Sequence, residues 1–99
     1  MARWTTRVLK EVFALVREGR YRLTLKAASE LGQLDLDLEP HEISEVLLSL
    51  KPSDGVNRVR SEHDGSWLYI FRPTVEEVSV YLKFRINEEC VVISFHEFH

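Results

Sequence analysis

Every second residue from Val78 to Ile86, in the stretch VSVYLKFRI, is apolar. Successive side chains of an extended strand point to opposite faces, so one face of this segment is apolar throughout. The other face carries Tyr81, Lys83 and Arg85. The pattern predicts a half-buried β-strand, one face of which covers a core while the other is free to meet solvent or a ligand.

Helical spacing dominates the first half of the chain. Apolar residues recur three and four positions apart before Gly19 and again before Pro52, and both of these residues commonly follow helix ends. The stretch LDLDLEP alternates and could be a strand, but we prefer an extended lead-in, because Pro40 restricts Glu39 to extended geometry and can sit in a first helical turn. The expected elements are a helix over residues 6–18, a short strand over 21–25, a short helix over 26–31 and a helix over 41–50.

Alternating segments separated by turn residues fill the second half. Residues 51–55, KPSDG, have the composition of a turn, and Asp64-Gly65 is a hairpin turn signal. Helices followed by an antiparallel meander give an α+β fold, with N-terminal helices packed on one face of a C-terminal antiparallel sheet. The expected strands cover residues 56–62, 66–72, 79–86 and 90–95.

Length and composition narrow the class of protein. The 99 residues, 44% of them hydrophobic, fit a single domain spanning residues 1–99. We expect a cytoplasmic protein without membrane contact, because the N-terminal apolar residues are interrupted by charges and no long apolar run follows. Cys90 is the only cysteine, which excludes a disulfide framework. The net charge of −3 argues against a dedicated nucleic-acid binder, although a local basic patch can work on an acidic protein.

The polar face of the strand over 79–86 gathers the candidate site. Alternation in the last strand places Val91, Ile93 and Phe95 on one face and Val92, Ser94 and His96 on the other, so His96 is expected on the side of Tyr81. Arg58 and Arg60 are two positions apart and therefore share one face of their strand. Arg72 is the last residue of the strand over 66–72. These residues predict a sheet face that carries a phenol, cations and an imidazole.

Such residue types suit cleavage of RNA by attack of a 2′-hydroxyl on its own phosphate. The reaction needs a proton acceptor, a proton donor and cations that hold the phosphate, but it requires no metal and no cofactor. Tyrosine and histidine can transfer protons, and lysine and arginine bind phosphate. A solvated strand face is the commoner origin of such an alternation. Trp67 could stack on a base, but core packing is the usual role of such a residue.

The tail His96-Glu97-Phe98-His99 allows a metal-binding alternative. It holds three potential ligands, but no fourth is nearby and a frayed terminus is the simpler interpretation. We therefore assign no metal site.

Short motifs in the C-terminal half resemble those of a known family. They are Trp67, Phe71-Arg72-Pro73, the segment Val80-Tyr81-Leu82-Lys83 and the segment Val92-Ile93-Ser94-Phe95. In order and spacing they are similar to the MqsR (motility quorum-sensing regulator) family of toxin ribonucleases. The resemblance implies a RelE-like fold, metal-independent mRNA cleavage and neutralisation by a cognate antitoxin, expected to be of the helix-turn-helix type.

The resemblance also implies roles for individual residues. The functional tyrosine of the family falls on Tyr81, its arginine before proline on Arg72 and its strand lysine on Lys83. His96 stands where the family has a lysine and is expected to be the second proton-transfer group. The candidate catalytic residues are therefore Tyr81, His96, Lys83 and Arg72, and the candidate RNA-binding residues are Arg58, Arg60, Arg85 and Trp67.

Two departures from the family support a second hypothesis. Leu68 replaces the family's glutamine, and residues 55–57 read GVN where the family has Phe-Tyr-Lys. With the acidic net charge, these departures fit a non-catalytic interaction module on the same fold. Such a module would use a strand edge or the basic face to bind an antitoxin-like protein.

Overall fold

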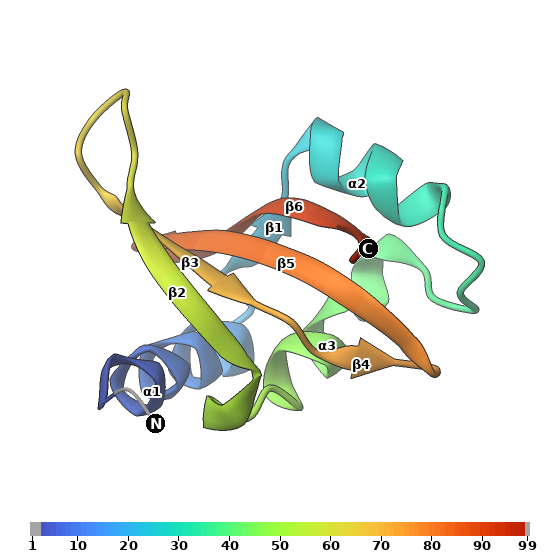
Figure 1. Ribbon diagram of the computed structural model, residues 1–99, viewed down its shortest axis with the longest axis horizontal. Coiled ribbons are helices and arrows are strands. Elements are labelled where there is room, and N and C mark those ends of the chain that lie inside the picture. Colours follow the sequence, from blue (N-terminus) through green and yellow to red (C-terminus); the bar gives the residue numbers. More distant parts are fainter. Residues whose placement is uncertain (1–2, 99) are drawn as a thin grey trace.

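The computed structural model describes residues 3–98 as helices followed by a sheet, so the α+β class predicted from the sequence is confirmed (Figure 1). The helices are α1 (Arg3–Arg17), α2 (Leu25–Gly32) and α3 (Ile43–Leu48), with 3-10 turns η1 (Pro40–Glu42) and η2 (Pro52–Asp54). The strands are β1 (Tyr21–Leu23), β2 (Gly55–Arg60), β3 (Trp67–Phe71), β4 (Thr74–Val75), β5 (Val78–Asn87) and β6 (Glu89–Glu97).

The sheet is mixed rather than purely antiparallel. Its strand order is β1-β6-β5-β3-β2, and β4 pairs with β5. All pairs are antiparallel except β1 with β6, which run parallel from Tyr21 opposite Cys90 to Leu23 opposite Val92. The expected antiparallel sheet is corrected in this one respect, because a strand from the start of the chain joins the edge of the C-terminal meander.

Helix α1 packs its apolar stripe against the sheet. Val8, Val12 and Val16 are buried at helical spacing, and Gly19 follows the helix end with a φ of 76°. The helix begins at Arg3, three residues earlier than expected. Figure 1 shows α1 and α3 on one side of the sheet. Three fully buried phenylalanines from three strands lie in this core: Phe71, Phe84 and Phe95.

Helix α2 starts directly where β1 ends. The backbone N–H of Thr24 donates to the Val92 carbonyl over 3.0 Å, which extends the pairing of β1 with β6 by one bond. The Thr24 hydroxyl then accepts from the Ala27 N–H over 3.1 Å and caps the helix. Ala27 and Leu31 are buried in the core, so α2 lies along β6 beyond the end of β1.

A β-bulge at Ile93 changes the phase of β6. Lys83 pairs with Ser94, whereas Phe84 pairs with Val92, so Ile93 is an extra residue on β6. The predicted alternation along this strand is therefore wrong upstream of the bulge. Val92 and Phe95 both belong to the core, although their three-residue separation would place them on opposite faces of a regular strand. His96 follows the bulge, and its predicted face is correct.

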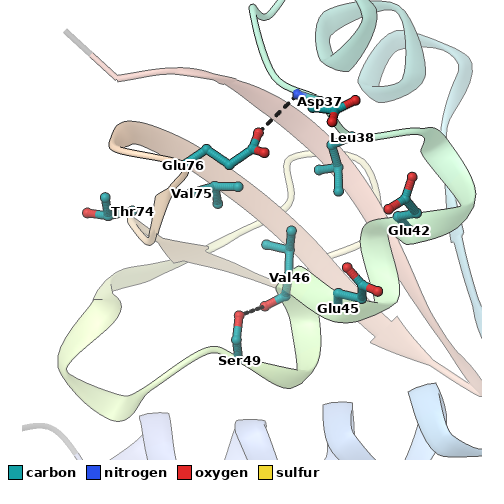
Figure 2. A pocket seen from close by; sticks show the side chains of 9 residues that line it. All are labelled: Asp37, Leu38, Glu42, Glu45, Val46, Ser49, Thr74, Val75 and Glu76. Atoms are coloured by element: carbon teal, nitrogen blue, oxygen red, sulfur yellow. Dashed lines mark hydrogen bonds between the residues drawn. The ribbon is translucent and has the colours of Figure 1, made fainter.

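A strained hairpin joins β4 to β5. Its two turn residues, Glu76 and Glu77, have φ values of 49° and 71°, which non-glycine residues rarely adopt. The Glu76 carboxylate accepts the Asp37 backbone N–H over 3.0 Å, so the hairpin holds the extended segment 34–39 (Figure 2). That segment forms no strand, as predicted, and η1 follows it. The two-residue strand β4 directly follows Pro73 and gave no recognisable alternation in the sequence.

Candidate active site

The rings of Tyr81 and His96 stack on the sheet face opposite the phenylalanine core. The two residues are register partners on β5 and β6, with ring centroids 4.9 Å apart and ring planes 10° from parallel. Both rings are partly exposed. The shared face predicted for these residues is therefore observed, and the register makes them direct neighbours.

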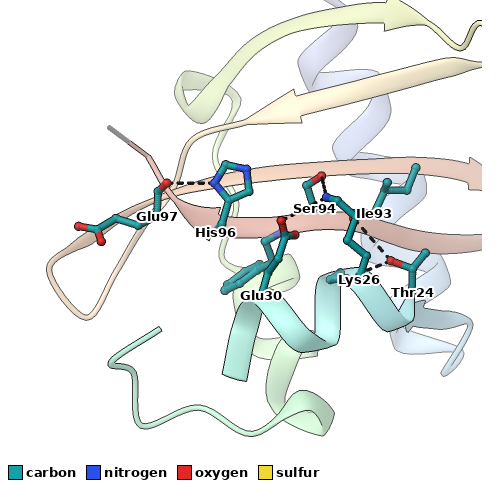
Figure 3. Close-up of polar contacts among 9 residues, drawn as sticks. Thr24, Lys26, Glu30, Ile93, Ser94, His96 and Glu97 are labelled. Carbon is teal, nitrogen blue, oxygen red and sulfur yellow. Dashed lines mark hydrogen bonds and ion pairs between the residues drawn. The ribbon is translucent and has the colours of Figure 1, made fainter. Parts of the chain in front are cut away.

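The contact of His96 with its own strand fixes the orientation of the imidazole. Its Nδ1 lies 3.0 Å from the Glu97 backbone oxygen (Figure 3). A carbonyl oxygen can only accept, so Nδ1 carries the hydrogen. In the neutral imidazole this leaves Nε2 with the lone pair. His96 can therefore take up a proton at Nε2.

Two cationic side chains flank this pair on the same face. Lys83 lies two residues along β5 from Tyr81 and pairs with Ser94. Phe71 pairs with Leu82, so Arg72, the next residue after Phe71, lies beside Tyr81 by register and alternation. Its guanidinium carbon is 4.6 Å from the centre of the Phe98 ring. Arg72, Lys83, Tyr81 and His96 therefore share one surface, which agrees with the expected grouping of the four candidate catalytic residues.

Helix α2 supports the β6 side of this surface. The Lys26 ammonium donates to the Ser94 hydroxyl over 3.0 Å and to the Glu30 carboxylate over 3.2 Å (Figure 3). The other oxygen of Glu30 accepts the Phe95 backbone N–H over 3.0 Å. Two helical side chains thus hold the residues that directly precede His96.

Burial acts to raise the pKa of Glu30, but the Phe95 N–H, the Lys26 ammonium and the charge on His96 outweigh it and lower the pKa below its usual value. The carboxylate therefore stays ionised beside the Tyr81–His96 pair. Sequence reasoning missed Glu30, Lys26 and Ser94. The spacing of Lys26 and Glu30 predicts an ion pair on a helix, but the contacts with β6 join residues more than sixty positions apart.

By strand register, Arg58, Arg60 and Trp67 lie on the opposite face of the sheet from Tyr81. Arg60, the last residue of β2, also borders a hollow that Lys83 and Arg85 line. Arg58 pairs with Tyr69 and Arg60 pairs with Trp67, on the face where Tyr69 stacks on Trp4 of α1. The guanidinium carbons of Arg58 and Arg60 lie 4.3 Å and 3.8 Å from the centre of the Trp67 ring.

The expectation of one polar face that unites all the candidate residues is therefore wrong. The odd and even positions of β2 and β3 could not be assigned to faces before the register with β5 was known. Tyr69 is half-buried, packs against the core and pairs with Phe84, so it lies on the face opposite Tyr81. Burial also raises the pKa of its phenol.

Arg85 lies on the same face as Tyr81 and Lys83, further along β5. It pairs with Val91, and its Nε is buried and has no hydrogen-bond partner among residues 3–98. Arg85 is thus the one candidate RNA-binding residue that the structure places on the Tyr81 face by strand register.

Metal ligands do not gather in the described part of the chain. Residues 3–98 hold no group of three histidine, cysteine or acidic side chains with the spacing of a metal site. His99 of the considered tail lies outside the described residues. None of the described helices is long and apolar enough to span a membrane.

Comparison with known proteins shows the family of the chain. Residues 5–97 match the family model described as "Motility quorum-sensing regulator, toxin of MqsA". The chain is also similar to the mRNA interferase toxin MqsR of Escherichia coli (strain K12). The two are 29% identical over 90 residues, which cover 90% of each protein.

Proposed function

The chain belongs to the motility quorum-sensing regulator family of toxins, and from this premise we propose that it is an endoribonuclease that cleaves single-stranded mRNA. The observation that carries the proposal is the stacked Tyr81–His96 pair with Lys83 and Arg72 on the same face. These four side chains supply two proton-transfer groups and two phosphate-binding cations.

The proposed step uses His96 as the base. The 2′-hydroxyl gives its proton to Nε2 of His96, and its oxygen attacks the adjacent phosphorus. The bond from phosphorus to the 5′-oxygen breaks, and that oxygen takes the proton of the Tyr81 hydroxyl. The products are a 2′,3′-cyclic phosphate and a 5′-hydroxyl end. Water then carries the proton from His96 back to the Tyr81 phenolate.

Lys83 and Arg72 have electrostatic roles in this proposal. Negative charge grows on the phosphate oxygens as the 2′-oxygen attacks, and fixed cations at that point lower the barrier. Arginine can bind two phosphate oxygens at once, whereas lysine acts as a point charge. Because side chains supply both protons and charge, we propose that the reaction needs no metal ion, so cleavage should persist in excess EDTA.

The partner follows from the same premise. The family is described by its antitoxin, and we propose that a cognate antitoxin neutralises this chain in the cytoplasm, where its mRNA substrate is found. The expected partner is a helix-turn-helix protein that is encoded by a gene next to the gene of this chain. Co-expression with that protein should restore growth, and the two should co-purify.

Expression of the chain alone in a bacterial host tests the activity. We expect growth arrest and recurrent mRNA cleavage sites, mapped by primer extension. Tyr81→Phe and His96→Ala should each lower cleavage of a purified RNA by about 10²-fold or more, the scale of a lost proton-transfer group. Tyr21→Phe and His41→Gln are matched controls outside the surface formed by Tyr81, His96, Lys83 and Arg72. Both should cleave as the wild type does.

Other outcomes would contradict the assignment. Full activity in both Tyr81→Phe and His96→Ala would place the chemistry elsewhere. A folded wild-type protein that neither arrests growth nor cuts mRNA would favour the non-catalytic interaction module.

A further inference from the structure

A hollow of about 490 Å³ lies beside the proposed active site on the face of Tyr81. Lys83 and Arg85 line it from β5, Leu68 from β3 and Ile93 from β6. Arg60 at the end of β2 and residues 61–63 of the loop that follows, which Figure 1 shows projecting past the sheet, form the remaining wall. Its volume falls within the range of about 300–1,000 Å³ that small-ligand sites occupy. Lys83 belongs both to this hollow and to the catalytic surface, so the two are continuous.

The loop wall is held by its own hydrogen bonds. The Asp64 carboxylate accepts both the backbone N–H and the hydroxyl of Ser66, at 3.0 Å and 2.7 Å. The Gly65 N–H donates to the Ser61 carbonyl, and Arg60 donates to the Gly65 carbonyl over 2.8 Å. Hydrogen bonds from Ser66, with help from the charge of Arg85, lower the pKa of Asp64. The loop that carries this wall is therefore cross-linked by its own hydrogen bonds.

The hollow has an apolar part and a positively charged part. Leu68 and Ile93, both partly exposed, are its apolar lining, and Lys83 and Arg85 bring two positive charges. A buried N–H without an acceptor is costly, and the Arg85 Nε is such a group among residues 3–98. The guanidinium of Arg60 already lies over the Trp67 ring and donates a hydrogen bond to the Gly65 carbonyl.

We propose that this hollow binds the nucleotide next to the scissile phosphate of a single-stranded RNA. The base lies against Leu68 and Ile93, and its phosphate is held by Arg85 and Lys83. Tyr81, Lys83 and Arg85 follow at every second position of β5, about 7 Å apart, so an RNA strand lying along β5 passes from the catalytic pair into the hollow. The inference rests on the proposed function and names the subsite that selects the neighbouring base.

The ligand class follows from this combination of groups. The carboxylates of an acidic peptide would satisfy the cations, but a second, aromatic residue would be needed to cover Leu68 and Ile93, whereas a single nucleotide provides a base and a phosphate together. Glu62 also lines the hollow and repels a phosphate placed near the loop. The phosphate is therefore expected on the β5 side, away from Glu62.

Binding and cleavage are measured separately in the test. Fluorescence anisotropy of a labelled single-stranded RNA of mixed sequence is recorded with the Tyr81→Phe protein, which is expected to cleave slowly, at salt concentrations from about 50 to 200 mM. Arg85→Gln should weaken binding several-fold and reduce the salt slope by about 0.7, the value for one lost phosphate contact on a single strand. Glu62→Gln should strengthen binding, and the exposed Lys10→Gln on α1 should change neither quantity.

The cleavage profile then tests the base-binding part of the subsite. In the background with Tyr81 intact, Leu68→Gln should change the base preference at one position beside the cut in a randomised RNA pool, because an amide replaces the apolar lining. An unchanged profile, or unchanged RNA binding in Arg85→Gln, overturns the subsite. Loss of antitoxin binding but not of RNA binding in Arg85→Gln would assign the hollow to the antitoxin instead.

The two proposals can fail independently. If the wild type binds RNA with the predicted dependence on Arg85 and Glu62 but does not cut it, the hollow is still a nucleotide-binding site, and the ribonuclease assignment fails. If the wild type cuts RNA and Arg85→Gln leaves the affinity and salt slope unchanged, only the subsite fails. Absence of both binding and cleavage refutes both.

Discussion

Glu30 offers the sharpest test of how α2 supports the proposed active site. Its carboxylate accepts the Phe95 N–H and pairs with Lys26, and its side chain is 21% exposed. A hydrogen bond to a charged group contributes about 1.5–3 kcal/mol and a neutral one about 1 kcal/mol, while an exposed helical ion pair adds about 0.4 kcal/mol. Glu30→Gln keeps an acceptor for Phe95 but loses the charge, so it should cost about 1 kcal/mol of unfolding free energy. Glu30→Ala should cost about 2 kcal/mol.

The pH dependence of stability separates the effect of the Glu30 charge from that of the Glu30 side-chain shape. The pKa of Glu30 is lower in the folded protein than the ordinary value of 4.5. Its ionic contribution is therefore fully present above about pH 4.5 and is lost as the pH falls through the folded pKa. The difference in stability between the wild type and Glu30→Gln should be largest at pH 7 and shrink in more acidic buffer.

Urea denaturation at pH 7 and at a series of lower pH values measures both effects. Glu45→Gln is the matched control, because the Glu45 side chain is exposed and makes no hydrogen bond or ion pair with residues 3–98. It should leave the unfolding free energy within about 0.5 kcal/mol of the wild type. A Glu30→Gln effect no larger than that of Glu45→Gln, or one that grows on acidification, would refute the reasoning.

Three further predictions concern stability and reactivity. Gly55→Ala should cost about 1–3 kcal/mol in urea denaturation, because a Cβ there would collide with the Thr5 side chain, whereas Gly32→Ala meets nothing within 4 Å and should be tolerated. Glu77→Gly should stabilise the protein by about 0.5–1 kcal/mol, seen as a higher Tm, because glycine relieves the φ of 71°; a lower Tm would contradict this. Burial, with a smaller effect of Glu89, raises the pKa of the Cys90 thiol to about 12, so alkylation at pH 8 should require unfolding.

Much of the local structure was predictable because local patterns determine it. The apolar stripe ending at Gly19 gave α1, and the alternation of VSVYLKFRI gave β5 and the polar face that carries Tyr81. Each of these signals lies within about fifteen residues of sequence. The Asp64-Gly65 signal gave the β2–β3 hairpin, although the connecting loop is longer than a tight turn.

The rest depended on contacts between distant segments. The bulge at Ile93 has no signature in its own residues, since every residue of CVVISF suits either face of a strand. The sides taken by Arg58 and Trp67 follow from the register of β3 with β5, which a single sequence does not encode visibly. Glu30 became part of the site only when α2 was placed along β6.

The parallel pairing of β1 with β6 has a consequence for synthesis of the chain. β6 follows every other described element in the sequence, and it separates β1 from the rest of the sheet. A nascent chain that has not reached β6 has no partner for β1, no anchor for Glu30 and no His96. Such long-range pairing also slows folding, because chain entropy is lost before the contacts form. Under the proposed function, a nascent chain that has not yet formed β6 therefore lacks an assembled active site.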